Sequence, residues 1–491
     1  MPRSSTLHRP RRRVACQPRV DPLEGRQLLS AGFDSAFGVG STTGCMSPHS
    51  IAVDSAGNSY VTGMFMGTVD FDPTKTNSSA ILTSSGSDDI FVAKYSASNT
   101  LDWVHQMGSN YVFSTSQPTY TWQLESGHAI AVDASGNVYV TGDFGGKASF
   151  GPFTLNSVGN TDVFVTKLGP DGTFLWAQSW GTAGMDIGSG IAVDGAGNVI
   201  SVGIPGTTTG LYTGFEINKY SPSGVLQWTD NISDTQGRTS SVATDTAGNI
   251  YLCGGFEGRV NFNPAPHKTD DVTGSAGSAY VLKLTPSGAF GWVSPFLAET
   301  AQSPGAYVNP YSLTVDAAGN IDVGGVYKGK DDFNPSSSVT ETLPNIGEDY
   351  DGFVAQLSSA GALNWATPLG GAVLSSVATD ANGNVYATGT FDNSSPFTPG
   401  NGLPAVTCNG VGNGFVAGLS GSTGAVSWAE TFGELGNTSA MAIAVYSSGT
   451  TLYIDVVGIF LGTANFDPAG TYDLTNPATG YDQEMFVLEL G

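Results

Sequence analysis

Two histidines stand at matching places in consecutive copies of a repeated phrase, and they are the first candidates for chemistry. His49 and His128 each lie five residues before an aspartate, Asp54 and Asp133. Imidazoles can bind a divalent cation, transfer a proton or bond to a polar ligand. We expect the pair to contribute to ligand binding, and the alternative is two partly exposed histidines at loop ends. Later copies of the phrase carry Ser189, Ser240, Tyr311, Ser375 and Met441 at this place.

An aromatic insert between Gly108 and Gly127 is the second candidate. Its sequence, YVFSTSQPTYTWQLE, is the longest connection of its kind in the chain. Exposed aromatic side chains are common anchors for ligands. We therefore expect ligand contacts here, unless the loop folds back and buries its rings. The four candidates are Tyr111, Phe113, Tyr120 and Trp122.

Motifs for covalent catalysis and metal binding do not stand out. We find no Ser-His-Asp order, carboxylate pair or Gly-x-Ser-x-Gly elbow, so we expect no catalytic residues and no resident cofactor. A divalent cation at the histidine pair, or at Asp70 and Asp72, stays an alternative. The cysteines lack CxxC spacing, Cys253 is expected in the core, and a Cys45–Cys408 bridge is left open.

The elements that must position these residues come from one repeated unit. An apolar strand ends in Asp, a turn with Gly-Asn follows, and a second apolar strand ends in Gly. The aspartates are Asp54, Asp133, Asp194, Asp245, Asp316 and Asp380, with Tyr446 in the last copy. An aromatic and then a Phe near a Pro come next, except in the third copy; these phenylalanines are Phe71, Phe150, Phe262, Phe333, Phe397 and Phe466. A third strand and a fourth follow, the fourth carrying Trp103, Trp176, Trp228, Trp292, Trp365 or Trp428.

The residue types of this unit favour small sheets that are covered on both sides. Val, Ile and Tyr runs are typical of strands, and here both faces are apolar. The Asp-x-x-Gly-Asn links fit tight hairpins, so the aspartates are expected to bond to turn amides rather than to a metal. One Trp in each unit is expected to wedge between neighbouring units. Four strands in each of seven units, without helical periodicity, predict an all-β, seven-bladed β-propeller with four-stranded antiparallel blades.

The phrase Ile-Ala-Val-Asp…Gly-Asn-Val-Tyr-Val-Thr-Gly resembles the SBBP repeat, a bacterial seven-bladed β-propeller repeat related to NHL-type propellers. The resemblance spans about residues 33–491. It implies that the Ile-Ala-Val-Asp strand is innermost in each blade. It also implies that the connections into the first strand, and those between the second and third strands, share one loop-rich face. We expect the ligand at this face.

The two ends of the repeat array are expected to meet. The last copy stops at FVLELG with no Trp strand, whereas FDSAFG, from Phe33, parallels LWAQSWG, from Leu175. In that alignment Phe33 takes the place of Trp176. Residues 33–38 should therefore form the outer strand of the blade made by residues 441–490, because a missing strand would leave a bare sheet edge.

Charge and composition narrow the class of ligand. Residues 1–32 hold seven arginines and two acids, so this stretch is +5 and the rest of the 491-residue chain is −24 − 5 = −29. Such an acidic body repels phosphate backbones, so nucleic acid is not expected as a partner. No apolar run is long enough to cross a membrane, and we expect a monomer.

The basic stretch contains LEGRQLLSA, residues 23–31, which resembles a short element near the N-terminus of secreted and surface proteins of planctomycete-type bacteria. This resemblance implies export, to the cell surface or beyond. We expect residues 1–32 to be an unstructured leader and residues 33–491 to form the propeller. A disordered basic tail on a cytoplasmic protein is the alternative.

These features favour a non-enzymatic secreted or cell-surface propeller that binds a protein or glycan through its loop-rich face. One alternative is a propeller lyase or hydrolase that uses His49 or His128 beside a loop acid at the channel mouth. Another is a structural module of a surface layer. An enzyme predicts a few polar residues converging at the channel, whereas a binding module predicts a broad face of aromatics and acids.

Overall fold

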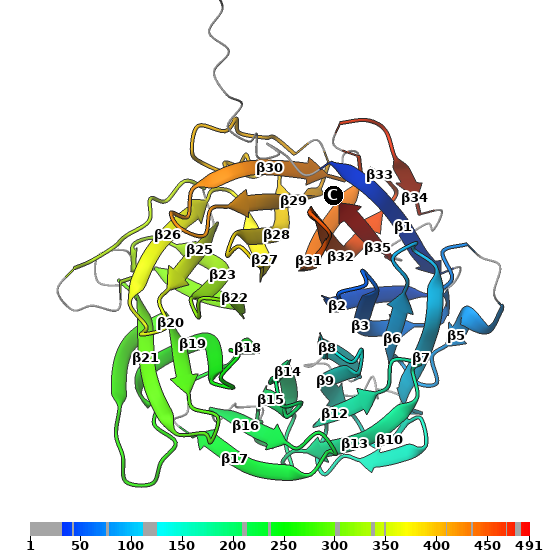
Figure 1. The fold of residues 1–491 in the computed structure, drawn as a ribbon, viewed down its shortest axis with the longest axis horizontal. Coiled ribbons are helices and arrows are strands. Elements are labelled where there is room, and N and C mark those ends of the chain that lie inside the picture. The colour runs from blue at the N-terminus through cyan, green and yellow to red at the C-terminus, as the bar shows by residue number, and fades with distance from the viewer. Residues whose placement is uncertain are drawn as a thin grey trace, which may run out of the picture.

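The computed structural model describes most of the chain outside the N-terminal stretch. The described residues are 32–41, 44–74, 78–110, 125–208, 214–233, 237–299, 305–334, 339–347, 350–408, 410–433, 436–467, 469–476 and 483–491. Apart from one short 3-10 helix, η1 (Ser78–Ala80), the regular elements in these ranges are β-strands. The strands stand around a central opening (Figure 1). The fold class is all-β, as predicted.

The strands pair in four-stranded antiparallel groups, each named here by its innermost strand. The β2 group contains β2 (Cys45–Val53), β3 (Ser59–Met66), β6 (Asp89–Tyr95) and β7 (Leu101–Ser109). The β8 group contains β8 (Ser126–Val132), β9 (Val138–Phe144), β12 (Asp162–Leu168) and β13 (Phe174–Trp180). The β14 group contains β14 (Ile187–Val193), β15 (Val199–Ile204), β16 (Phe215–Tyr220) and β17 (Leu226–Ile232).

The remaining groups continue around the opening in chain order. The β18 group contains β18 (Ser241–Thr244), β19 (Ile250–Asn261), β20 (Asp271–Leu284) and β21 (Phe290–Ala298). The β22 group contains β22 (Tyr307–Val315), β23 (Ile321–Lys328), β25 (Asp351–Leu357) and β26 (Leu363–Leu369). The β27 group contains β27 (Val373–Thr379), β28 (Val385–Asp392), β29 (Gly412–Leu419) and β30 (Val426–Phe432).

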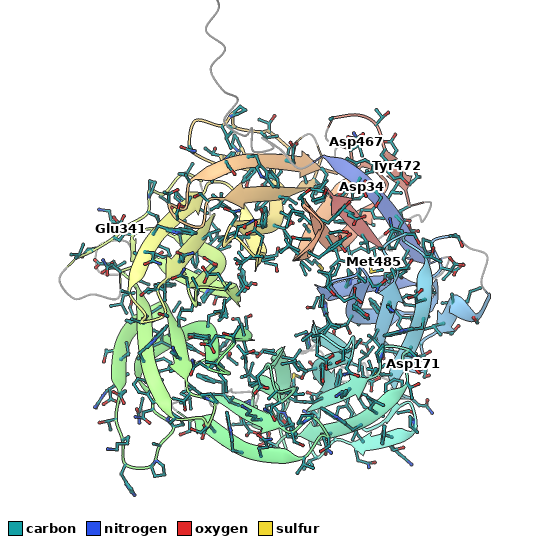
Figure 2. The ribbon with its side chains drawn as sticks, in the orientation of Figure 1. Asp34, Asp171, Glu341, Asp467, Tyr472 and Met485 are labelled. Carbon is teal, nitrogen blue, oxygen red and sulfur yellow. The ribbon has the colours of Figure 1, made fainter. Side chains whose placement is uncertain are left out.

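The β31 group joins the two ends of the described chain. It contains β31 (Asn437–Ser448), β32 (Thr451–Leu461), β35 (Glu484–Leu490) and, as its outer strand, β1 (Phe33–Ser41). β1 pairs antiparallel with β35 from Phe33–Leu490 to Val39–Met485, so the predicted pairing of these segments is confirmed. Figure 2 places Asp34, at the start of β1, near Tyr472 of the neighbouring loop.

The register of β1 differs by two residues from the one predicted. In the β8 group Trp176 pairs with Lys167 and Phe174 with Leu168. The matching pairs in the β31 group are Ser35 with Glu489 and Phe33 with Leu490. Ser35 therefore takes the place of the tryptophan, and Phe33 takes the place of Phe174. A shift of two residues keeps the same side chains on the same face of a strand, so the apolar pattern could not separate the two registers.

Two faces of the molecule follow from the antiparallel pairing. The turns that end each first strand and each third strand lie on one side, which we call the turn face. The connections into each first strand, and those between second and third strands, lie on the other side, which we call the loop face. On the turn face Asp133 accepts N–H bonds from Ser135 and Asn137 and a bond from the Tyr139 hydroxyl. The prediction that these aspartates are turn residues is confirmed.

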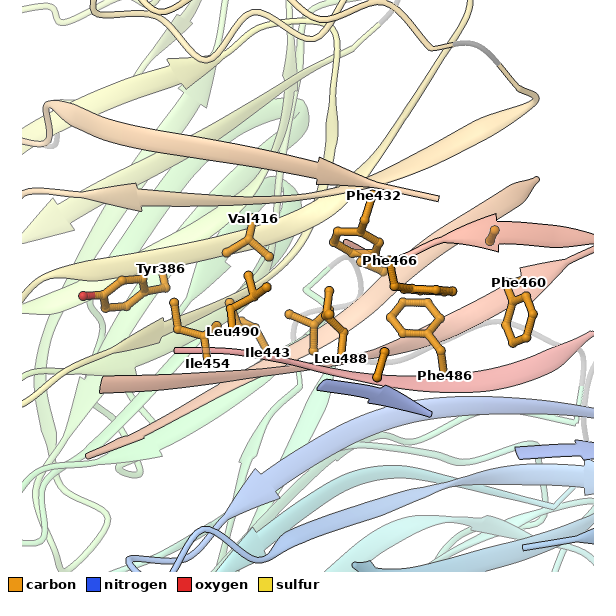
Figure 3. Close-up of a cluster of buried hydrophobic side chains, with 14 of the residues drawn as sticks. Tyr386, Val416, Phe432, Ile443, Ile454, Phe460, Phe466, Phe486, Leu488 and Leu490 are labelled. Carbon is orange, nitrogen blue, oxygen red and sulfur yellow. The ribbon is translucent and has the colours of Figure 1, made fainter. Parts of the chain in front are cut away.

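The cores lie between neighbouring groups rather than inside any one of them. Side chains of β35 alternate: Phe486, Leu488 and Leu490 pack toward the β27 group, whereas Met485 and Val487 pack toward the β2 group. Figure 3 shows the first of these clusters, in which Phe432 and Phe466 lie beside Phe486. Each small sheet is therefore covered on both sides, as the apolar strands predicted.

The tryptophans join each group to the next one. Four of them donate the indole N–H to a carbonyl in the third-to-fourth-strand turn of the following group. The pairs are Trp103 with Pro170, Trp176 with Pro222, Trp292 with Ser359, and Trp365 with Gly421. The predicted role of tryptophan as a wedge between repeat units is confirmed.

The connections between second and third strands contain short strands that the sequence analysis did not predict. They are β4 (Thr68–Asp70), β5 (Ile81–Thr83), β10 (Lys147–Phe150), β11 (Phe153–Asn156), β24 (Asp331–Asp332), β33 (Thr463–Asn465) and β34 (Asp473–Thr475). The repeated Phe of these connections is fully buried in every copy that has it, for example at Phe71 and Phe150. It anchors the connection against its group, as expected.

Cys45 and Cys408 do not form a disulfide with each other. The Cys408 thiol instead donates to the side-chain oxygen of Asn413, and Cys253 is a buried core residue as predicted. Within the described ranges, no helix has the length and apolar character needed to span a membrane.

Candidate functional site

The residues equivalent to His49 all reach the central cavity, and in six of the seven groups a β-bulge directs them there. In the pairing of β2 with β3 the register shifts between Pro48 and Ser50, so His49 is the extra residue. In the β8 group the register shifts between Gly127 and Ala129, so His128 is the extra, unpaired-in-register residue of the bulge. A bulge breaks the alternation of a strand and re-aims one side chain. Other innermost strands are bulged at Ser189, Tyr311, Ser375 and Met441.

The glycine that ends the second-strand motif makes room for this bulge. Gly142 lies opposite Gly127, beside the bulged His128. A Cβ at Gly142 would overlap the carbonyl oxygen of Ser126, two residues before that histidine. Only glycine permits so close a backbone approach. The same overlap with the equivalent carbonyl recurs at Gly63, Gly203, Gly254, Gly325, Gly389 and Gly458.

A polar cavity of about 220 Å³ lies where these strands meet. Serine hydroxyls form much of its wall, together with both histidines and Tyr311. Ser50, Ser241 and Ser312 each accept an N–H from the innermost strand of the next group, which leaves their own O–H free to donate. Ser375 donates to the carbonyl of Ala440, which leaves its oxygen free to accept. The wall therefore offers both donors and acceptors.

His49 is held as a neutral imidazole. Its Nδ1 lies 3.3 Å from the Gly127 carbonyl and 2.9 Å from the Ser126 hydroxyl, and its Nε2 lies 3.2 Å from the Ser47 hydroxyl. Because a carbonyl can only accept, Nδ1 carries the proton. Burial and the neighbouring His128 lower the pKa of His49 to about 3, against a smaller opposing effect of the Gly127 carbonyl.

His128 has a buried acidic partner on the adjacent strand. Its Nε2 lies 2.5 Å from Oδ1 of Asp143, whose side chain is only 5% exposed. Burial alone would lower the pKa of His128, but the charge of Asp143 and the hydrogen bond to it outweigh burial and raise that pKa. The ring also stacks on His49, with centroids 5.3 Å apart and an interplanar angle of 4°.

The sequence analysis missed Asp143, although the repeat contains a signal for it. Asp143 follows the glycine of the second strand, where the other copies have Met64, Ile204, Gly255, Val326, Thr390 and Ile459. Asp143 is a single carboxylate at a place where the other copies have uncharged residues. It lies on the strand next to the one that carries His128, and this placement indicates a His–Asp pair.

The remaining predicted site residues have different outcomes. His49 and His128 are brought together in the cavity, and their role in binding stays a prediction. Tyr111, Phe113, Tyr120 and Trp122 lie outside the described residues. Asp70 and Asp72 accept bonds from nearby turn groups. Among the described residues no group of three or more His, Cys, Asp or Glu side chains could hold a metal ion.

The architecture defines the class of protein. Four-stranded antiparallel groups stand around a central opening, innermost strands line a cavity, and cores lie between the groups. This arrangement is that of a β-propeller. The family model described as SBBP, beta-propeller repeat, matches residues 39–64. The chain therefore has a β-propeller architecture, and residues 39–64 are similar to this repeat.

The chain is also similar to part of one curated protein and to solved structures. An uncharacterised WD repeat-containing protein of Acanthamoeba polyphaga mimivirus is 24% identical over 306 residues, which are 48% of this chain and 22% of that protein. The chain thus spans about a fifth of that relative's length. A catalytically inactive virginiamycin B lyase from Staphylococcus aureus is similar with a TM-score of 0.42 and 8% identity, over 92% of this chain and 99% of that one.

A further solved structure is similar at the same low level. The quinohemoprotein alcohol dehydrogenase from Comamonas testosteroni matches with a TM-score of 0.39 and 10% identity, over 93% of this chain and 76% of that one. Both TM-scores are low.

Proposed function

We propose that the chain is a secreted or cell-surface binding module without catalytic activity. In this proposal the four-stranded groups are the seven blades of one propeller, and β1 closes the ring. The ligand is a protein or a glycan that approaches the loop face and places one polar group in the central cavity. We further propose that the protein works as a monomer without a resident cofactor.

The cavity wall is the observation that carries this proposal. The residue equivalent to His49 in each group lines one space, and four of these seven residues bear hydroxyls that can donate or accept. A volume of about 220 Å³ is below the ~300–1,000 Å³ typical of sites for drug-sized ligands. It suits one sugar ring or one amino-acid side chain. The stacked histidines add one neutral ring and one ring whose charge is balanced by Asp143.

Filling the cavity tests the proposal. Ser240→Tyr places in the cavity wall the residue that the β22 group carries at the equivalent place, Tyr311. Val225→Tyr is the matched control, because Val225 is exposed on the turn face. Both variants and the parent would be tested on a glycan array and by titration with partners purified after capture from the native cell surface.

We expect the parent and Val225→Tyr to bind the same ligand with equal affinity. Ser240→Tyr should lose that binding while its thermal melting stays unchanged. Equal affinity of Ser240→Tyr and the parent would refute the cavity as the binding site.

A second candidate function rests on the buried pair His128–Asp143. An imidazole oriented by a carboxylate is a common arrangement for general acid–base catalysis, as required in a lyase or hydrolase. In this alternative His128 exchanges a proton with a substrate in the cavity, and Asp143 holds the ring. Asp143→Asn should then abolish turnover of any substrate found and leave binding intact, whereas in a pure binding module only affinity would change.

A further inference from the structure

Three tyrosines form a continuous strip on the loop face, outward from the central cavity. Tyr311 lines that cavity and is 38% exposed. Tyr307 lies four residues earlier on β22, and its ring packs edge to face against Tyr350, with centroids 5.9 Å apart. Burial, the Tyr311 ring and a hydrogen bond to it contribute to raising the pKa of Tyr307 to about 12. Tyr350, at the outer end, is 45% exposed.

The outer end of the strip opens into a second cavity between the β22 and β27 groups. This rim cavity has a volume of about 220 Å³ and is lined by Tyr350, Val373, Thr390, Asp392, Ser394 and Ser395. Its wall combines an aromatic ring, a partly exposed aliphatic side chain, three hydroxyls and one carboxylate. The polar central cavity and this mixed rim cavity, which have similar volumes, are thus joined by a row of tyrosine rings.

We propose that this strip binds a neutral oligosaccharide chain, with one sugar in the rim cavity and a terminal sugar in the central cavity. The inference rests on the proposed function, because it names the ligand class of the same loop-face site. Tyrosines between the two cavities then support the sugars that connect them.

The side chains of the strip match the two kinds of surface that a sugar presents. The C–H face of a pyranose is apolar and packs on an aromatic ring, which offers a large rigid contact area at low entropic cost. The hydroxyls at the sugar's edge need donors and acceptors. In the rim cavity Asp392 and the Ser394 oxygen can accept, while the Ser394 O–H already donates to Asp392. The Thr390 hydroxyl is paired with that of Ser439, and this pair keeps one acceptor or donor position for a sugar. A carboxylate is an acceptor for sugar O–H groups and makes strong bonds to them.

The charge of the protein favours a neutral oligosaccharide over an acidic one. The full sequence has a net charge of −24, and the described residues that line the rim cavity include Asp392 but no Lys or Arg. An acidic sugar would meet repulsion there. The cation near the strip is Lys328, whose Nζ lies 5.1 Å from the centroid of the Tyr350 ring. Lys328 is not among the residues that line the rim cavity. An acidic oligosaccharide is the alternative ligand that the experiment must distinguish from a neutral one.

Calorimetric titration of the full chain with defined oligosaccharides tests the inference. The probes are neutral hexaoses of xylose, glucose and mannose, their monosaccharides, and a hexamer of a uronic acid. Tyr311→Ala and Tyr350→Ala remove the two exposed rings of the strip. Tyr472→Ala is the matched control, because Tyr472 is 41% exposed and lies at the outer edge beside β1 (Figure 2). Tyr350→Phe keeps the ring and removes only the hydroxyl.

We expect one neutral hexaose to bind at least about tenfold more tightly than its monosaccharide, since several rings contact it. Tyr311→Ala and Tyr350→Ala should each weaken that binding by about tenfold or more. Tyr350→Phe and Tyr472→Ala should bind like the parent. Melting temperatures of all variants would show that a loss of affinity is not a loss of fold.

The failure of this inference can be separated from the failure of the proposed function. If a ligand binds and Ser240→Tyr abolishes it while the tyrosine variants bind like the parent, the central site stands and the strip is refuted. If the tyrosine variants lose hexaose binding and Ser240→Tyr does not, the strip stands without the central cavity. Binding of the uronic acid hexamer alone, of a protein alone, or of none of the neutral probes overturns the assignment to a neutral oligosaccharide.

Discussion

Single residues give the central cavity two opposite responses to pH. His49 is buried as a neutral ring, so its burial opposes protonation. His128 is held beside Asp143, so protonation of its ring is favoured. The stacked rings make the two protonation events oppose each other, because two adjacent imidazolium ions repel.

Asp143→Asn should destabilise the protein most at low pH. The pKa of His128 is raised in the folded state, so its pairing with Asp143 adds stability that is fully present below the unfolded pKa of about 6.5 and is lost as pH rises through the folded pKa. Urea unfolding of the variant and the parent at pH 5.5 and at pH 9 measures this. A free-energy difference that is equal at both pH values would contradict the role of the pair.

His49→Gln should reduce the loss of folding stability that the parent shows at acidic pH. The pKa of His49 is lowered to about 3, so the parent loses stability as pH falls from about 6.5 toward 3, because the unfolded chain takes up a proton that the folded chain does not. Removing the imidazole should therefore flatten the acid limb of the stability curve. The measurement is the same unfolding series, extended to pH 4; an unchanged slope would show that His49 is not buried in its neutral form.

Zinc should not bind the histidine pair tightly. Both nitrogens of His49 lie against protein partners, and Nε2 of His128 is already bonded to Asp143, so a cation would have to displace these contacts. Calorimetric titration with zinc should thus give equal heats for the parent and the His49→Ala, His128→Ala double variant. A larger heat for the parent would establish a two-histidine cation site.

At this scale, repeated residues were predictable and unrepeated ones were not. The turn aspartates and the buried phenylalanines recur at fixed spacing, and their roles follow from local chemistry. Asp143 occurs once, and its role depends on a partner across the sheet. Whether Cys45 and Cys408 pair depends on the distance between two loops, which no spacing rule in the sequence predicts.

At the scale of elements, the contact between a tryptophan and the following turn repeats with matched partners. Gly224 has a positive φ of 81°, and a Cβ there would lie 2.8 Å from the indole of Trp176. Where β1 supplies Ser35 in place of tryptophan, the following turn carries Asn99 in place of glycine, with φ of 59°. Asn99 then donates to the Ser35 hydroxyl over 2.7 Å. The two residue types change together.

Gly224→Ala should therefore destabilise the protein more than an equivalent change at an open turn. Gly319→Ala is the control, because Gly319 has a similar φ of 84° and the closest atom to an added Cβ is 3.6 Å away. The control should cost about 1–2 kcal/mol for the left-handed backbone. Gly224→Ala should cost about 1–3 kcal/mol more, because the indole must move. Equal costs in urea unfolding would show that the tryptophan does not press on the turn.

The order and pairing of the main strands were predictable because the apolar runs recur with tight turns between them. The short strands β10 and β11 were not, since their residues alternate without a strong apolar run and they pair only with each other and with β7. The predicted register of β1 was wrong by two residues for a different reason. A shift of two residues leaves the alternation of buried and exposed side chains unchanged, so both alignments satisfy it.

At the scale of the molecule, the first and last described strands depend on each other. Gly32 and Gly491 exchange two backbone hydrogen bonds of 2.9 Å, next to the paired strands β1 and β35. β1 also contributes Phe37 and Val39 to the core between the β31 and β2 groups. A strand contributed from the opposite end of the chain lets the outermost edge of the β31 group be covered.

Truncation measures the contribution of that strand. Deleting residues 1–31 should leave the melting temperature unchanged, because β1 is kept. Deleting residues 1–40 removes the outer strand of the β31 group and should cost several kcal/mol, a large part of the stability of an ordinary domain. Two truncated proteins that melt at the same temperature would show that β1 does not hold the proposed ring closed.

The direction of β1 also decides how the molecule would be displayed. Phe33 pairs with Leu490, at the end of a third strand, so the first and last described residues, Gly32 and Gly491, lie on the turn face. A tether attached through either end would hold this face toward its support. The loop face, with the tyrosine strip, would then point outward into the medium, where a polymer chain can approach it without passing the support.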